Sequence, residues 1–349
     1  MKICHVINSL SGGGAETHLL DLVHAQKNQG HSVTVISTGP DKKNMKSLEQ
    51  EFKDVSDNVL RLYFPRLFNF YSYIKFFKNL KDEQYDIVHT HQPRSDFMFF
   101  ILKSITGIKA KWIVSIHGKY DTYLEGNILF DQIRKLSMPL LVNIWNNSNQ
   151  KICISDEVKN WLSTYKIKSD ISVVNYWINN TKLENLEENK ECINIGFMGR
   201  VNKNKGIEDL LDVYEGLNKD RYNLLIAGIC EDTYLKKLNE RFDLKNVTFL
   251  GYVSNKEEFF SNIDIFVFPS YSEGLGLALL ESMSYSKICI SRDVAPMNSI
   301  LNKDSGYLFH NNEELKSIIL DCGQLFKEDL LPLNKKLSNQ YNLLNEKYN

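Results

Sequence analysis

The chain has 349 residues, 43% of them hydrophobic and 24% charged, and its formal net charge at pH 7 is −1. This length predicts two domains, because a single hydrophobic core stops growing beyond about 250–300 residues. No apolar run approaches the roughly 20 residues that cross a bilayer, the N-terminus turns polar too early for a signal peptide, and the six cysteines are scattered. These features argue against a membrane-spanning, disulfide-rich or nucleic-acid-binding protein and predict a cytoplasmic one.

Short β-rich runs alternate with helical patterns along the whole chain, which predicts parallel sheets covered by helices. We expect an α/β protein of two doubly wound Rossmann-like domains, residues 1–178 and 179–330, that face a central ligand cleft. A helix over residues 331–349 can pack back on the first domain. The expected strands are residues 2–8, 31–38, 86–91, 111–117, 151–155, 171–175, 192–199, 222–228, 247–253, 264–270, 287–291 and 306–309.

A glycine-rich turn, SLSGGGAETH at residues 9–18, follows the first strand and opens a helix. Such a turn lets backbone amides approach a phosphate, helped by the helix dipole. Its spacing fits a dinucleotide fingerprint poorly, and the next strand ends in Ser37 and Thr38 without an acid for an adenosine ribose. A nicotinamide enzyme is therefore not expected, and a plain tight turn remains the alternative.

The segment at residues 61–81, RLYFPRLFNFYSYIKFFKNLK, combines eight aromatic and five basic residues with no acid. This mixture suits peripheral contact with the anionic inner face of the cytoplasmic membrane. A core helix with solvated lysines is the competing interpretation.

Histidines end two strands of the first domain. His89 and His91 share one face of the strand in HTHQPRSD, and His117 ends the strand in SIHG. The motif lacks a third ligand, so we expect no metal site. His91 is a candidate for the acceptor side of the cleft, core packing fits His89 equally well, and His117 taken alone reads as structural.

Two cations follow the first strand of the second domain, in GRVNKNKG at residues 199–206. Arg200 and Lys205 leave the ligand edge of the sheet together, so both can reach a diphosphate. Solvated loop cations are the alternative, and this is the expectation for Lys203.

Two carboxylates flank an apolar run in EGLGLALLE at residues 273–281. In one unbroken helix Glu273 and Glu281 would lie about 12 Å apart, too far for a glycosidase pair at about 5–9.5 Å. The glycines instead predict a loop that carries Glu273 and a buried helix that begins near Gly276. Glu281 on that helix needs hydrogen-bond donors, which sugar hydroxyls or a structural ion pair could supply.

Taken in order, the glycine-rich turn, the GR and KG pair and the two glutamates with seven residues between them resemble the retaining GT-B glycosyltransferases of family four. The resemblance implies metal-independent transfer of a hexose from a nucleotide-diphosphate sugar, with UDP favoured over GDP, to a glycan or lipid-linked acceptor. In bacteria such enzymes build capsule, O-antigen or exopolysaccharide. No further cofactor is implied.

The resemblance also suggests catalytic roles. Glu273 and His117 would lie beside the donor sugar, and Arg200 with Lys205 would neutralise the leaving diphosphate.

Further positions would bind the rest of the donor. Glu281 would hold the ribose and the amides of Gly276 and Leu277 the phosphates. Gly13 and Gly14 would close on the donor from the opposite domain. Tyr252 and Val253 would cradle the base.

Two segments depart from the family pattern. Tyr176 and Trp177 stand where relatives have Asn-Gly, so the interdomain turn is expected to differ. Residues 291–301, SRDVAPMNSIL, lack the usual Gly-Gly and following Glu.

Three other functions remain open. A nucleotide-sugar epimerase or a phosphorylase would use the same scaffold, although no motif singles out a cofactor lysine. A non-catalytic sugar-binding protein would be expected to have lost site residues, which are present here.

Overall fold

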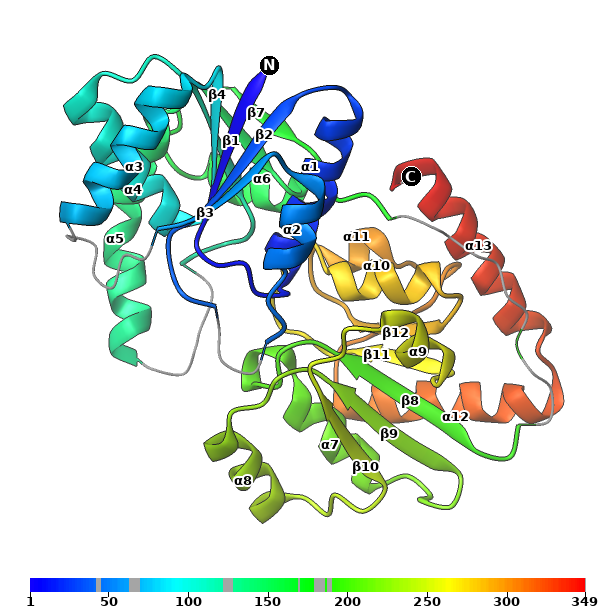
Figure 1. Cartoon of the computed structure of the whole chain (residues 1–349). Helices are drawn as coiled ribbons and strands as arrows, with labels where there is room; N and C mark the ends of the chain where they lie inside the picture. The colour runs from blue at the N-terminus through cyan, green and yellow to red at the C-terminus, as the bar shows by residue number, and fades with distance from the viewer. Residues whose placement is uncertain are drawn as a thin grey trace. The chain divides into compact units, whose positions relative to one another are not determined.

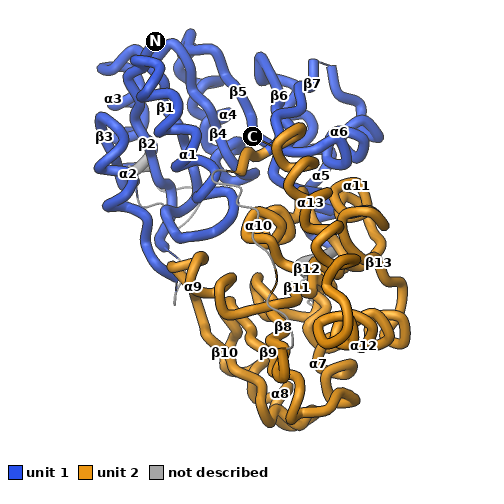
Figure 2. The backbone as a smooth tube through the Cα atoms, turned by 90° about the vertical axis from the view of Figure 1, so that its right-hand side faces the viewer, with its two compact units in different colours: residues 1–121, 129–175 blue, residues 122–128, 176–349 orange. Residues whose placement is uncertain are grey.

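The structure, a computed structural model, describes residues 1–41, 45–62, 70–121, 128–168, 170–178, 186 and 190–348. The chain divides into two compact units, residues 1–121 with 129–175 and residues 122–128 with 176–349 (Figure 2). The first unit ends at Asn175, where the sequence placed the boundary after Ile178.

The first unit is a seven-stranded parallel sheet in the order β3-β2-β1-β4-β5-β6-β7, with helices on both faces (Figure 1). Its strands are β1 Lys2–Ile7, β2 Ser32–Ser37, β3 Asn58–Arg61, β4 Ile87–His91, β5 Lys111–Ile116, β6 Gln150–Cys153 and β7 Ile171–Val173. Its helices are α1 Gly14–Asn28, α2 Glu49–Val55, α3 Phe70–Glu83, α4 Pro93–Thr106, α5 Ile128–Asn146 and α6 Asp156–Ser163.

The second unit repeats this topology with six parallel strands in the order β10-β9-β8-β11-β12-β13. Its strands are β8 Ile193–Met198, β9 Tyr222–Ala227, β10 Val247–Gly251, β11 Ile265–Phe268, β12 Ile288–Arg292 and β13 Tyr307–Phe309. Its helices are the 3₁₀ turn η1 Lys203–Lys205, α7 Ile207–Glu215, α8 Asp232–Arg241, α9 Lys256–Ser261, α10 Leu277–Ser284, α11 Met297–Ile300, α12 Asn312–Glu328 and α13 Leu331–Lys347.

Both sheets therefore confirm the predicted pair of doubly wound domains. In each, consecutive strands diverge from a switch point, between β1 and β4 in the first unit and between β8 and β11 in the second. Loops at the carboxyl ends of strands on either side of a switch point are the usual ligand site of such sheets.

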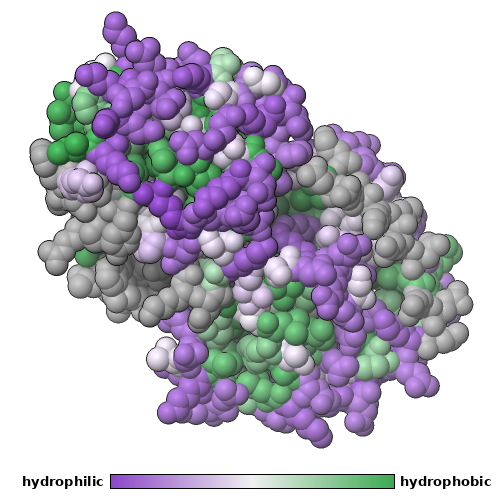
Figure 3. Space-filling model, viewed as in Figure 1, coloured by the Kyte–Doolittle hydropathy of each residue, from purple (hydrophilic) through white to green (hydrophobic). Residues whose placement is uncertain are grey.

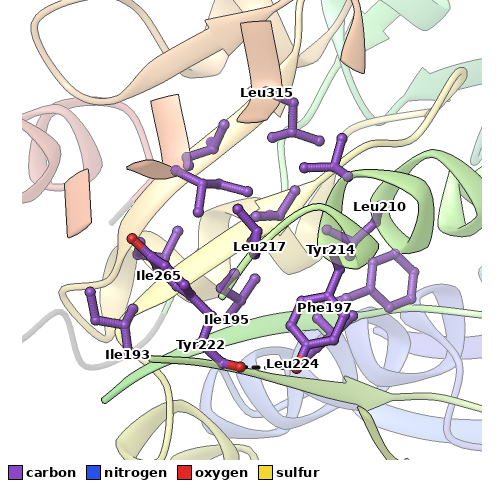
Figure 4. Close-up of a cluster of buried hydrophobic side chains, with 14 of the residues drawn as sticks. Ile193, Ile195, Phe197, Leu210, Tyr214, Leu217, Tyr222, Leu224, Ile265 and Leu315 are labelled. Carbon is purple, nitrogen blue, oxygen red and sulfur yellow. Dashed lines mark hydrogen bonds between the residues drawn. The ribbon is translucent and has the colours of Figure 1, made fainter. Parts of the chain in front are cut away.

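Apolar strands buried on both faces hold each sheet in place. In the second unit Ile195 and Phe197 of β8 lie in one cluster with Leu210 and Tyr214 of α7 (Figure 4). Each such side chain contributes about 1.5–3 kcal/mol by leaving water. The hydroxyl of Tyr214 is buried with them because it donates to the carbonyl of Tyr222 at 2.9 Å.

One strand and the packing of one predicted helix lay outside the sequence predictions. The sequence did not predict the edge strand β3, because this strand has only four residues and none of them is buried. Helix α13 packs on α10, α12 and β12 of the second unit, and Ile178 N donates to the Tyr348 carbonyl at 2.7 Å. Its predicted contact with the first domain stays a prediction.

Across the described ranges, no helix combines the length and the apolar character needed to cross a bilayer.

Candidate functional site

The loop after β8 folds over the end of β11, so two of the predicted ligand segments meet at the switch point of the second unit. Tyr271 N donates to the Asn204 carbonyl at 3.0 Å. Gly206 has a φ of +69°, and a Cβ there would lie 2.1 Å from the Pro269 carbonyl oxygen. Only glycine fits this contact, which explains the glycine of the KG pair.

The turn holds Lys205 beside Glu273. Lys205 Nζ lies 2.5 Å from Glu273 Oε1, and each side chain is only 12% exposed. The sequence assigned these residues to separate parts of a donor, the diphosphate and the sugar. In the structure the two side chains form an ion pair, at the edge of the sheet where each was expected. Arg200 lies in the same loop and is exposed.

Helix α10 begins where the sequence predicted. Gly276 is its N-cap, in the left-handed region at φ +86°, and the helix runs from Leu277 to Ser284. Leu279 N and Leu280 N donate to the Gly276 carbonyl. Within the described residues no side chain caps this end, so its first amides and the positive end of the helix dipole remain suited to an anion.

Glu281, one and a half turns into α10, has an ionic partner that the sequence did not assign to it. Its carboxylate pairs with Lys256 of α9, and its side chain is 14% exposed. The structure therefore shows the ion pair that the sequence left open as an alternative. Lys256 follows Tyr252 and Val253, which are both half-buried beyond the end of β10. Only tertiary contact between α9 and α10 reveals this lysine.

In the first unit, the glycine-rich turn leads from β1 into α1. Helix α1 begins at Gly14 with Gly13 as an extended N-cap. Glu16 in its first turn is buried and accepts a hydrogen bond from Ser9 Oγ at 3.0 Å. The turn is thus held by its own side chains.

Five of the seven histidines of the first unit lie together, four of them buried and His117 half-buried. His5 of β1 lies opposite His89 in the parallel register with β4, and His91 lies two residues further on. His5 Nδ1 is 3.1 Å from His91 Nε2, and His91 Nδ1 is 3.3 Å from His117 Nε2, just beyond β5. His18 of α1 contacts the His117 ring edge-on.

Burial keeps these rings neutral. It lowers the pKa of His5 and His117 to about 4, and that of His91 and His89 well below the usual value, with neighbouring histidines adding to the effect on the last two. His18 has a pKa lowered to about 3, by burial first and then by His117 and His5.

The sequence missed His5 as a member of this cluster, because its strand reads as an ordinary buried strand. One ring nitrogen from each of His5, His89 and His91 lies within 4.8 Å of the others, which supplies the third potential metal ligand that the HTH motif lacks. The expected absence of a metal site stays a prediction.

Comparisons with known proteins cover nearly the whole chain. Residues 12–181 match the model of Glycosyltransferase Family 4, and residues 179–340 match Glycosyl transferases group 1.

Two glycosyltransferases are similar to most of the chain in sequence, and one solved structure is similar to it in fold. The chain is 25% identical to the capsular polysaccharide biosynthesis glycosyltransferase CapH of Staphylococcus aureus, over 88% of this chain and 86% of the relative. It is 25% identical to the O-antigen biosynthesis glycosyltransferase WclY of Escherichia coli, over 75% and 76%. The fold is similar to Anabaena Alr3699/HepE in complex with UDP-glucose, with a TM-score of 0.82 at 17% identity over 100% and 96% of the two chains.

Proposed function

The chain is a GT-B glycosyltransferase, and we propose that it transfers a hexose from a UDP-sugar to a glycan or lipid-linked acceptor hydroxyl. The proposal includes retention of the anomeric configuration, independence of a metal ion, and a place in bacterial surface-polysaccharide synthesis. The capsular and O-antigen relatives support the pathway, and the UDP-glucose complex of a protein with the same fold supports the donor class.

The observation that carries the proposal is the placement of Lys205, Glu273 and the uncapped end of α10 at one switch point. A diphosphate is the ligand that uses both a lysine and a helix N-terminus. When it binds, Lys205 turns to the phosphates, and the Glu273 carboxylate becomes available to accept hydrogen bonds from the donor sugar.

The reaction follows from these roles. The acceptor oxygen attacks the anomeric carbon on the face from which the diphosphate leaves. A bond from this carbon to the acceptor oxygen forms while the bond to the diphosphate oxygen breaks, and the departing phosphate takes the acceptor proton. Arg200, Lys205 and the amides of Gly276 and Leu277 stabilise the charge that develops on the leaving group.

Other residues bind the remainder of the donor in this proposal. Glu281 exchanges Lys256 for the ribose hydroxyls, and Tyr252 with Val253 contacts the base. The role that the family resemblance gives His117, beside the donor sugar, stays a prediction. The assigned roles of Gly13 and Gly14 toward the donor and of His91 toward the acceptor remain predictions.

Transfer and binding assays test the proposal together. UDP should raise the melting temperature of the wild type more than GDP does, because the tighter ligand stabilises the folded state more. A ligand at 100 times its Kd stabilises by about 2.7 kcal/mol. Glu273→Gln and Lys205→Met should each reduce transfer at least about 100-fold. Lys203→Met, in the same loop but exposed, is the matched control.

Several results would contradict it. The donor site is wrong if neither nucleotide shifts the melting temperature, and the mechanism is wrong if the product anomer is inverted by NMR or if EDTA abolishes turnover. Interconversion of the UDP-sugar without an acceptor would identify an epimerase instead.

Peripheral membrane contact is a second part of the proposal. Within residues 61–81, positions 63–69 lie outside the described residues. Helix α3 exposes Tyr71 and Ile74, 75% and 50% exposed, beside the exposed Lys75 and Lys78. Apolar side chains next to cations suit an anionic bilayer surface. Figure 3 shows a largely hydrophilic visible face with smaller hydrophobic patches.

Vesicle flotation measures this contact. The wild type should float with vesicles that contain anionic lipid and less with neutral ones, and Ile74→Glu should reduce flotation. Leu331→Glu, at an exposed leucine of α13, is the control. Equal flotation of the two variants would remove α3 from the proposal.

A further inference from the structure

The histidines at the switch point of the first unit have few roles in the proposed reaction, in which His117 alone is assigned to the donor sugar. A hydrogen-bonded chain connects that residue to the outer end of helix α1. Gln26 of α1 lies with its Oε1 2.8 Å from His5 Nε2, and His5, His91 and His117 follow in sequence at 3.1 and 3.3 Å.

The chemistry of Gln26 sets the direction of every hydrogen bond in this chain. The Gln26 amide is placed with Oε1 toward His5, and in this placement the oxygen accepts and His5 carries its proton on Nε2. A neutral ring has one N–H, which makes His5 Nδ1 the acceptor of a hydrogen bond from His91 Nε2. By the same rule His91 Nδ1 accepts from His117 Nε2.

We propose that Gln26, His5 and His91 form a relay that fixes the proton of His117 on Nε2 and makes Nδ1 of His117 a hydrogen-bond acceptor. The three are positioning residues, because they act through His117. The full burial of His5 and His91 favours the neutral rings that the relay needs. That the relay matters for transfer rests on the proposed role of His117, whose Nδ1 would then accept from a hydroxyl of the donor sugar.

The cluster's other possible occupant, a metal ion, is incompatible with this relay. A metal held by His5, His89 and His91 would need lone pairs on nitrogens directed inward. In the relay the facing nitrogens of His5 and His91, 3.1 Å apart, share a proton instead. A stoichiometric metal in the purified protein would therefore overturn the relay.

Nitrogen NMR of the histidine rings tests the relay without any reference to transfer. The protein is labelled with [15N]histidine, and its eight histidines are assigned with single His→Gln variants. At pH 7.5 the rings of His5, His91 and His117 should each show the Nε2–H tautomer. The Nδ1–H tautomer at His117, or an even mixture there, would overturn the proposal.

Variants of Gln26 separate a relay from simple packing. Gln26→Leu removes the acceptor at one end of the relay and should shift the tautomer ratio of His117, at the other end, by roughly two- to tenfold. This is the effect expected from the loss of one neutral hydrogen bond. Gln26→Glu keeps an acceptor oxygen and should preserve the wild-type tautomer. Gln29→Leu, an exposed glutamine at the end of the same helix, is the matched control. No difference between Gln26→Leu and Gln29→Leu would overturn the relay.

Transfer assays on the same variants keep this inference distinct from the proposed function. A fall in kcat/KM that parallels the tautomer shift supports both. A tautomer shift with unchanged transfer supports the relay and removes His117 from the reaction. A wild type that transfers no sugar refutes the proposed function, and the NMR result still decides the relay.

Discussion

Acidification from pH 7.5 to pH 5.0 should destabilise the first unit by several kcal/mol, because neutral histidines are buried there. An unfolded histidine has a pKa near 6.5, whereas burial lowers the pKa of His5 and His117 to about 4 and that of His18 to about 3. Between these limits the unfolded state binds more protons than the folded state, so the free energy of unfolding falls as the pH falls. Between pH 7.5 and pH 5.0, each of these three histidines lowers the free energy of unfolding by about 2 kcal/mol.

Asp96 acts in the opposite direction. Burial raises its pKa from 3.8 to about 7, although hydrogen bonds from Thr90 and Trp145 oppose the shift. Between these pKa values the folded state therefore binds more protons than the unfolded state. For Asp96 alone, the same acidification raises the free energy of unfolding by about 2.5 kcal/mol. The four groups together give a net loss of about 3–4 kcal/mol. His89 and His91, with their lowered pKa, add to this loss.

Urea unfolding followed by tryptophan fluorescence measures the effect, because Trp112, Trp145 and Trp161 of the four tryptophans lie in the first unit. His18→Leu should reduce the difference between the two pH values by about 2 kcal/mol. His24→Leu, on the exposed side of the same helix, is its control. A first unit equally stable at both pH values would refute the reasoning.

Three further predictions concern one glycine, one ion pair and one buried carboxyl. Gly206→Ala should destabilise by more than about 2 kcal/mol, because it adds a steric clash to a left-handed φ, whereas Gly251→Ala at φ +65° with open space should cost about 1 kcal/mol; equal urea midpoints would contradict this. A double-mutant cycle with Lys205→Met and Glu273→Gln should give a coupling energy of about 1–3 kcal/mol in ligand-free unfolding, and zero coupling would show that the pair does not form. Asp96→Asn should steepen the acid loss of stability by removing the opposing titration, and an unchanged pH profile would argue against a raised pKa for this carboxyl.

The sequence predicted the fold well where one segment carried all the information. Strands such as β11 can be recognised in the sequence as continuous apolar runs, because both faces of a parallel strand are buried. The start of α10 was predicted from its glycines alone, because left-handed backbone at an N-cap favours glycine. The edge strand β3 gave no comparable signal, having little buried surface.

The chemistry of the switch points shows the same division. Sequence alone determined that the chain alternates strands and helices and where most of these elements lie. It also determined which loops follow the carboxyl ends of the strands, because all of this depends on local sequence pattern. Only the tertiary structure decided which charges meet. Lys205 reaches Glu273 and Lys256 reaches Glu281 across 68 and 25 residues, and His5 joins His91 across 86. Such contacts depend on strand register and helix packing, which no single segment encodes.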